Sequence, residues 1–300
     1  MNSIESFEND LELQLSFLRS FKSQKPLSQS HQKNTYFSGS GDSLVSSLLA
    51  ESFSGGIVKA MDPLDLCNNK KLAKSKHVYF VSVSGNTISN IKVAKIAKKS
   101  TAITSNPSSR LANASDEIIQ ITFPSTGLFT AGSISFLASA LTCISLVRKI
   151  TVPDESIFQK ARSVAKKTKL SKRIFVLGNM FTYPIAMYCA AKFYEVLGYD
   201  VHYCRIEQFS HMELFSAKKG DTVIILEEKN PHNKQLGEHL GKIGMNVVHP
   251  DVPPKKLDQM IFCVIFSQMI ALHEAKKKKL KECHFVIAKN IRNVSNKMIY

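Results

Sequence analysis

The sequence predicts an α/β protein built from two similar units, each a parallel sheet flanked by helices. Short apolar runs alternate with longer stretches whose apolar residues recur at helical spacing, a rhythm typical of parallel strands joined by crossover helices. The alternation pauses at residues 151–156 and then restarts. Because the chain is long enough for two domains of ordinary size, we expect one domain at residues 31–152 and a second at 153–283.

The first half of the chain supplies the elements of the first domain. A helix is expected at residues 4–21 from apolar residues that share one helix face, namely Ile4, Phe7, Leu11, Leu15 and Leu18. With the polar, proline-containing loop after it, this helix forms an N-terminal segment of residues 1–30. Short apolar runs predict strands at 35–41, 77–85, 101–106 and 117–124. Helical spacing predicts helices at 43–53, 88–99 and about 128–149.

The second half repeats the pattern. Pro153 and Asp154 are typical of a helix start. Helices are expected at 156–167, 183–197, 232–243 and 255–281. Apolar runs of strand length occupy 173–179, 201–209, 222–228 and 246–250. Residues 284–300 are basic without clear periodicity, so we expect an irregular C-terminal tail.

Charge and hydropathy restrict the possible partners. Lys and Arg number 40 against 24 Asp and Glu, a formal net charge of +16, which suits nucleic acid, an anionic membrane or a small phosphorylated ligand. The lysines are not interleaved with aromatic residues, and no finger, helix-turn-helix or RNA-recognition motif is present, so we expect no nucleic-acid partner. The longest apolar stretch, 127–147, contains six hydroxyl residues and predicts a buried helix rather than a membrane span.

Cysteine and histidine spacing indicates neither a disulfide framework nor a metal site. The six cysteines form no CxxC pair, and the nine histidines show no metal-ligand spacing. The N-terminus is acidic and amphipathic, unlike a secretory signal. We therefore expect a cytoplasmic protein with reduced thiols and without metal or cofactor.

Three turns rich in glycine or hydroxyl residues follow predicted strands and precede predicted helices: 39–43 (GSGDS), 82–87 (SVSGNT) and 125–130 (STGLFT). In a parallel sheet such turns lie at the carboxyl edge, where ligands bind. Hydroxyl groups and the N–H groups of a helix N-terminus hold a phosphate well. The candidate binding residues are Gly39, Ser40, Gly41, Ser43, Ser82, Ser84, Asn86, Thr87 and Ser125. The simpler interpretation is a small-residue turn followed by two ordinary helix caps.

The order of these motifs resembles the sugar isomerase (SIS) domain, which binds phosphosugars. Residues 82–87 match its S-x-S-G-N-T motif, and 125–130 are similar to the S-T-K-A-F-T of the isomerase domain of glucosamine-6-phosphate synthase. The helix from Pro184 resembles P-I-A-L-E-G-A-L-K-L-K-E of that domain, and 292–297 resemble its R-N-L-A-K with one residue inserted. The resemblance covers about residues 35–300 and implies two SIS domains, each a flavodoxin-like three-layer sandwich.

Exchange between an aldose and a ketose needs a base that carries a proton between C1 and C2, and a partly buried carboxylate suits that task. Glu195 is the candidate base, and Lys192, on the same helix face, is the candidate that steadies it. The resemblance implies that His211 opens the sugar ring from the neighbouring subunit of a homodimer. It also implies a functional lysine, Lys297 or else Lys289, in a tail that closes the active site. Without the resemblance, all five are ordinary polar surface or turn residues.

The resemblance therefore implies an enzyme that acts on a hexose phosphate through an enediol or enolamine intermediate. The favoured conversion is glucosamine 6-phosphate to fructose 6-phosphate, because the Lys192, Glu195 and His211 set also resembles archaeal glucosamine-6-phosphate deaminases. Two departures keep alternatives open: Tyr188 stands where the synthase motif has glutamate, and Gly41 where it has serine. The turns are similar to those of archaeal-type phosphoglucose/phosphomannose isomerases, the first alternative. A non-catalytic phosphosugar-binding regulator is the second.

Overall fold

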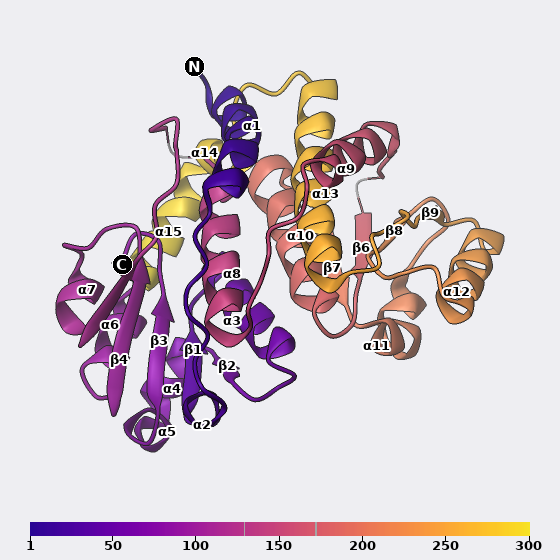
Figure 1. Ribbon diagram of the computed structural model, residues 1–300. Helices are drawn as coiled ribbons and strands as arrows, with labels where there is room; N and C mark the ends of the chain where they lie inside the picture. Colours follow the sequence, from indigo (N-terminus) through magenta and orange to yellow (C-terminus); the bar gives the residue numbers. More distant parts are fainter. Residues whose placement is uncertain (129, 172) are drawn as a thin grey trace. The chain divides into compact units, whose positions relative to one another are not determined.

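The chain forms two compact units, each holding one parallel sheet, in a computed structural model that describes residues 1–128, 130–171 and 173–300 (Figure 1). Unit A consists of Ser16–Ser125, Gly132–Thr151 and Lys289–Tyr300. Unit B consists of Met1–Leu15, Thr126–Ala131 and Val152–Ala288. Each unit is therefore assembled from separate stretches of the chain.

Unit A is built on a five-stranded parallel sheet, sheet A, with the strand order β2-β1-β3-β4-β5. Its strands are β1 Thr35–Ser38, β2 Lys59–Met61, β3 His77–Val81, β4 Lys99–Thr104 and β5 Glu117–Gln120. All four strand pairs are parallel. This is the strand order of flavodoxin-like folds, and it confirms the predicted fold class.

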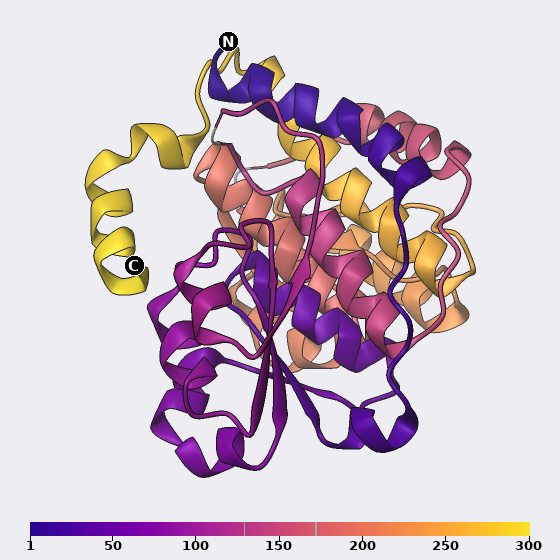
Figure 2. The same cartoon turned by 60° about the vertical axis from the view of Figure 1, so that its left-hand side comes forward.

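Helices cover both faces of sheet A (Figure 2). The helices of unit A are α2 Gln29–Lys33, α3 Asp42–Phe53, α4 Pro63–Asn68, α5 Lys70–Lys74, α6 Ile88–Ala94, α7 Arg110–Ala114, α8 Ile134–Val147 and α15 Lys289–Ile299. Helix α3 packs between α8 and strands β1 and β3, and α8 is buried along nearly its whole length, as its apolar sequence requires. On the other face, apolar side chains of α4 to α7 pack on Val78, Phe80 and Ala102.

Unit B is built on a four-stranded parallel sheet, sheet B, with the order β7-β6-β8-β9. Its strands are β6 Arg173–Leu177, β7 Asp200–Cys204, β8 Thr222–Ile225 and β9 Asn246–Val248. If the strands of each sheet are numbered in chain order, both sheets have the spatial order 2-1-3-4, which in sheet A is β2-β1-β3-β4. The two sheets therefore share one topology in their first four strands.

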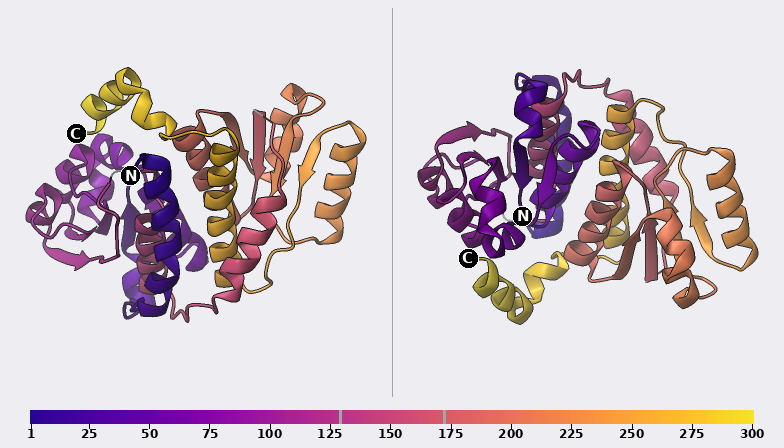
Figure 3. Two further views of the ribbon diagram at one scale, coloured as in Figure 1. Left: turned by 90° about the horizontal axis from the view of Figure 1, so that it is seen from above. Right: turned by 90° about the horizontal axis from the view of Figure 1, so that it is seen from below.

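Sheet B is also covered on both faces. Its unit contains α1 Ser3–Ser20 as far as Leu15, α9 Ser156–Lys167, α10 Thr182–Leu197, α11 Ile206–His211, the short helix η1 Glu213–Ser216, α12 Pro231–Lys242, α13 Lys256–Lys277 and α14 His284–Ile287. Side chains alternate along a strand: Phe175 and Leu177 pack with Phe209 and Leu240 on the side of α11 and α12. Figure 3 shows α12 on one side of the sheet and α13 on the other, where α13 packs with α9 and α10.

Several local predictions were wrong. Residues 206–209, predicted as the end of a strand, begin helix α11 instead. The three-residue strand β2 was missed, so the loop at residue 125 follows a fifth strand and not a fourth. The helix predicted at 88–99 ends at Ala94, because Lys99 already pairs with His77 as part of β4. The long apolar helix begins at Ile134 rather than near residue 128. Residues 284–300 are not irregular, because they form α14 and α15.

None of the helices within the described ranges is both long enough and apolar enough to cross a membrane. All six cysteines carry free thiols, and all but Cys67 are buried.

Candidate functional site

Two of the predicted binding turns meet at the carboxyl edge of sheet A. Residues 39–43 follow β1 and residues 82–87 follow β3, and these strands are parallel neighbours with Ser38 opposite Phe80. From β1 the chain passes to β2 on one side and then to β3 on the other. A switch of this kind opens a crevice at the carboxyl edge, and ligands of open parallel sheets bind there. The topology therefore places both turns at the expected binding position.

The first turn requires glycine at two positions. A Cβ on Gly39 would lie 2.7 Å from the Cβ of Ser43, which is too close for real atoms. Gly41 has a φ of 58°, in the left-handed region that favours glycine. Ser40 and Gly41 are exposed, and Ser43 is half-buried. The turn thus presents backbone and hydroxyl groups at the start of the 12-residue helix α3, where an anion is stabilised.

The second turn folds tightly against the end of β4. A Cβ on Gly85 would lie 2.0 Å from Oγ of Ser109, so only glycine fits. The Gly85 N–H donates to Oγ of Ser82 at 3.2 Å, and this hydroxyl lies 3.4 Å from that of Thr87. The side chain of Thr87 makes no capping bond to α6, which argues against its being an ordinary helix cap. Ser84 is exposed and Asn86 half-buried, so these two side chains are accessible to a ligand.

Two buried polar side chains of unit A lack hydrogen-bond partners among the described residues. They are the hydroxyl of Ser38, the last residue of β1, and both amide atoms of Asn90 on α6. Buried polar groups are almost always paired, because leaving one unpaired costs free energy. Both residues adjoin the two turns in sequence, and sequence reasoning missed them. They are candidates for binding a polar ligand or ordered water.

The third predicted turn differs from the other two. Ser125 is exposed and follows β5, which is separated from β3 by β4, so the strand order does not bring it beside the first two turns. The loop after it belongs to unit B. There the hydroxyl groups of Thr126 and Ser6 share a hydrogen bond, and the Thr130 hydroxyl donates to the Ser3 carbonyl at 3.0 Å. Phe129, within this motif, lies outside the described residues.

The candidate base and lysine of unit B form an ion pair on α10. The ammonium of Lys192 donates to Oε2 of Glu195 at 2.5 Å. The side chain of Lys192 is fully buried, whereas 36% of that of Glu195 is exposed. Lys192 is therefore not a solvated surface lysine. A buried ammonium needs compensation, and this carboxylate supplies part of it while remaining accessible to small molecules.

Other side chains surround this pair. The ring of Tyr188, one turn earlier, has its centroid 4.8 Å from the Lys192 ammonium. Burial raises the pKa of the Cys283 thiol, and the negative charge of Glu195 acts in the same direction. Cys283 in turn lies 3.7 Å from the Thr130 hydroxyl. The end of the third motif therefore contacts Cys283 within unit B.

The remaining predicted residues are on the surface. His211 ends α11, hydrogen-bonds Glu207 at 3.2 Å, and has 70% of its side chain exposed. Lys297 and Lys289 are both exposed on α15, in unit A. The structure thus joins Lys192 with Glu195, and the turns 39–43 with 82–87. It shows no contact that joins His211, Lys289 or Lys297 to either group within the described residues.

The carboxyl edge of sheet B differs from that of sheet A. Its own switch point lies between β6 and β8, and Glu227, two residues after β8, fills it. The Glu227 carboxylate accepts the N–H of Asn179 at 2.8 Å and the hydroxyl of Thr182, at the N-terminal end of α10. A side-chain anion therefore occupies the position in sheet B that corresponds to the paired turns of sheet A. Sequence reasoning missed Glu227, although its place after a strand was a signal.

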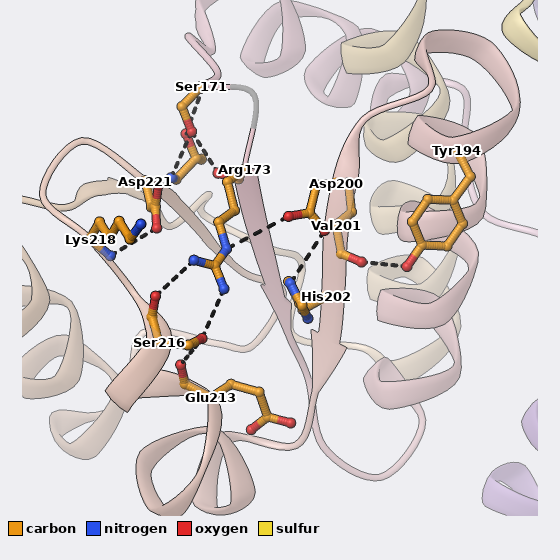
Figure 4. A network of polar contacts seen from close by, with 11 residues as sticks. Ser171, Arg173, Tyr194, Asp200, Val201, His202, Glu213, Ser216, Lys218 and Asp221 are labelled. Carbon is orange, nitrogen blue, oxygen red and sulfur yellow. Dashed lines mark hydrogen bonds and ion pairs between the residues drawn. The ribbon is translucent and has the colours of Figure 1, made fainter.

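Polar networks at the amino edges of the sheets connect structural elements. In unit B, Arg173 begins β6 and holds η1, donating to the carbonyl and hydroxyl oxygens of Ser216 at 2.7 and 2.9 Å (Figure 4). Its Nε lies 3.8 Å from Asp200, which begins β7 and also contacts His202. This edge is opposite to the one that binds ligands in open sheets. Within the described ranges, no group of three or more His, Cys, Asp or Glu side chains is placed to hold a metal ion.

Comparison with known proteins identifies the fold. No protein-family model and no curated protein matches the sequence. Among solved structures, glucosamine-6-phosphate deaminase from Thermotoga maritima matches with a TM-score of 0.76 at 18% identity, over 93% of this chain and 95% of that chain. The C-terminal domain of glucosamine-fructose-6-phosphate aminotransferase from Francisella tularensis matches with a TM-score of 0.70 at 14% identity, over 93% and 97%.

A third similar structure is tagatose-6-phosphate ketose/aldose isomerase from Escherichia coli, with a TM-score of 0.66 at 17% identity, over 93% of this chain and 91% of that chain. At such identities the likeness establishes the fold and no more. The chain has the α/β fold of the SIS-type phosphosugar isomerases and deaminases.

Proposed function

We propose that the protein is a phosphosugar isomerase or deaminase that acts on a hexose phosphate. The observation that carries the proposal is the ion pair of α10, a fully buried lysine 2.5 Å from a glutamate whose side chain is 36% exposed. A carboxylate that is accessible and held by a fixed cation is suited to accept a proton from carbon. The activities named for the similar solved structures support the same class.

The turns at the carboxyl edge of sheet A are the proposed phosphate site. Their backbone N–H groups and the side chains of Ser40, Ser84 and Asn86 offer neutral donors to a phosphate, as helix N-termini do in other phosphate sites. The net charge of +16 attracts anionic substrates from solution. The buried Ser38 and Asn90 side chains, which lack partners among the described residues, are further candidates for this site.

Glucosamine 6-phosphate is the proposed substrate, and water is the second reactant. After the ring opens, Glu195 removes the proton from C2 to give an enolamine and returns a proton to C1. The amine on C2 becomes an imine, water adds at C2, and ammonia leaves to give fructose 6-phosphate. Glucose or mannose 6-phosphate would undergo the same proton transfer through an enediol, without loss of ammonia.

The first prediction concerns Glu195. Glu195→Gln keeps the size of the side chain but removes the base, so kcat should fall by about 10²- to 10⁴-fold. Turnover of glucosamine, glucose and mannose 6-phosphates is followed as fructose 6-phosphate and ammonia. Glu238→Gln, an exposed glutamate of α12, is the matched control and should keep wild-type activity. Full turnover by Glu195→Gln would refute the assignment of the base.

The choice of substrate separates the two enzyme classes. Ammonia release from glucosamine 6-phosphate alone identifies a deaminase, and fructose 6-phosphate from the other two sugars identifies an isomerase. Proton transfer between C1 and C2 also incorporates deuterium from deuterated water. Tight binding of all three sugars without turnover or deuterium exchange would refute the proposed catalytic activity and indicate a phosphosugar-binding regulator.

We further infer a homodimer in which His211 opens the sugar ring in the site of its partner. The imidazole is 70% exposed at the end of α11, so it is accessible to a second copy of the chain, and histidine is suited to moving protons near neutral pH. Lys297, or else Lys289, is proposed to pair with the phosphate or the open-chain carbonyl. Both are exposed cations on α15.

The second prediction tests this arrangement by mixing two inactive variants. Glu195→Gln and His211→Asn chains are unfolded together in equal amounts and refolded, so that mixed dimers form. If His211 serves the partner's site, each mixed dimer has one site with both native residues, and the mixture should recover about a quarter of wild-type activity. Activity no higher than that of the separate variants would contradict a shared site.

A further inference from the structure

The buried ammonium of Lys192 raises the question of what fixes it beside Glu195. A lysine side chain has several rotatable bonds and a strongly hydrated head group, and its complete burial gives up that hydration. The bond to Glu195 is one contact that the ammonium makes. A neutral group packed against the ammonium would keep it in a single position without drawing it away from the carboxylate.

Tyr188 is placed to be such a group. It lies one helical turn before Lys192 on α10, is itself fully buried, and has its ring centroid 4.8 Å from the ammonium nitrogen. The face of an aromatic ring attracts a cation, and this attraction is stronger away from water. Because the ring carries no formal charge, it adds no anion that would compete with Glu195 for the ammonium.

The ring is held in turn by side chains from two other helices. The Gln268 side chain of α13 donates from Nε2 to the Tyr188 phenol oxygen at 2.8 Å, and its Oε1 accepts from Nε2 of Gln14 on α1 at 2.9 Å. Both glutamines are fully buried. Buried, hydrogen-bonded networks restrict side chains to one arrangement. The series Gln14–Gln268–Tyr188–Lys192–Glu195 thus runs through the interior of unit B and ends at the accessible carboxylate.

We propose that Tyr188, fixed by Gln268 and Gln14, is a positioning residue that aligns the Lys192 ammonium with Glu195. The inference rests on the proposed proton transfer, because it assigns Tyr188 a role in keeping the base in its working position. Tyr188 touches no reacting atom, so its removal should lower kcat and leave the KM for the sugar phosphate nearly unchanged.

The kinetic test compares three variants. Tyr188→Leu removes the ring, and kcat should fall by about 10- to 100-fold, as for other displaced catalytic groups. Tyr188→Phe keeps the ring and should retain kcat within about threefold. Tyr194→Phe, on the same helix, loses its bond to the Val201 carbonyl and serves as the control with wild-type kcat. A Tyr188→Leu protein that melts lower but keeps kcat per folded molecule would show a merely structural role and overturn the proposal.

A second readout requires no substrate. A buried ammonium held in hydrogen bonds exchanges its protons slowly with water, so wild type should give a lysine ammonium signal in a proton–nitrogen NMR spectrum that Lys192→Met removes. The signal should persist in Tyr188→Phe and disappear in Tyr188→Leu. Its persistence in Tyr188→Leu, or its absence from wild type, would overturn the proposal. If wild type turns over no sugar phosphate, the proposed function fails, and this signal still decides the role of Tyr188.

Discussion

At the residue scale, His77 shows how burial can set the charge of a side chain. It begins β3, stacks between the rings of His31 and Tyr79, and makes hydrogen bonds of 2.9 Å to His31 and 2.7 Å to Thr101. Burial, followed by the electrostatic effects of His31 and Lys99, lowers the pKa of His77 to about 4. The histidine is therefore neutral in the folded protein at neutral pH, at the amino edge of sheet A.

This depressed pKa predicts a loss of stability in mild acid. The unfolded histidine has a pKa of 6.5, so as the pH falls from there to about 4 the unfolded chain binds a proton that the folded chain does not. Stability must fall over that range, by at most about 3 kcal/mol. The free energy of unfolding of unit A should therefore depend less on pH in His77→Phe, which keeps the ring but cannot take a proton. Equal slopes for variant and wild type between pH 6.5 and 4 would contradict the prediction.

At the element scale, periodicity located most of the long or buried elements and missed short ones such as β2. The bounds of α10 were predicted to within one residue, because a helix that is apolar all round has a clear signal. Its only charged residues are Lys192 and Glu195. Their spacing indicates that they share a helix face. The complete burial of Lys192, however, depends on the packing of Tyr188 and of Gln268 on α13, and this tertiary packing cannot be detected from the sequence of α10 alone.

The missed elements have physical reasons of their own. Strand β2 has three residues, none fully buried, so its sequence carries no alternation that could be detected. The end of α6 was misplaced because residues 95–99 continue the helical spacing, whereas pairing with β3 extends Lys99 into β4. In α15 the apolar residues Ile291, Val294 and Met298 do recur at helical spacing, but the surrounding basic residues obscured the pattern.

At the scale of the whole molecule, one topology is used twice with different chemistry. Sheets A and B share the order of their first four strands, so each has a switch point at its carboxyl edge. In unit A this point is lined by the turns at 39–43 and 82–87. In unit B it is filled by the carboxylate of Glu227, which accepts from Asn179 and Thr182. A negative side chain at this position excludes a phosphate by occupying its donors and by repelling its charge.

The asymmetry predicts one phosphosugar per chain, which calorimetric titration with glucose 6-phosphate can measure. Wild type should saturate at one ligand per chain, bound by unit A. Glu227→Ala removes the anion and leaves the N–H of Asn179 and the N-terminal end of α10 without it, so a second, weaker binding event should appear and should be competed by inorganic phosphate. Glu228→Ala, which alters the exposed neighbouring carboxylate, should keep a single event. Two sites in wild type, or one site in Glu227→Ala, would contradict the view that Glu227 closes the second of two equivalent positions.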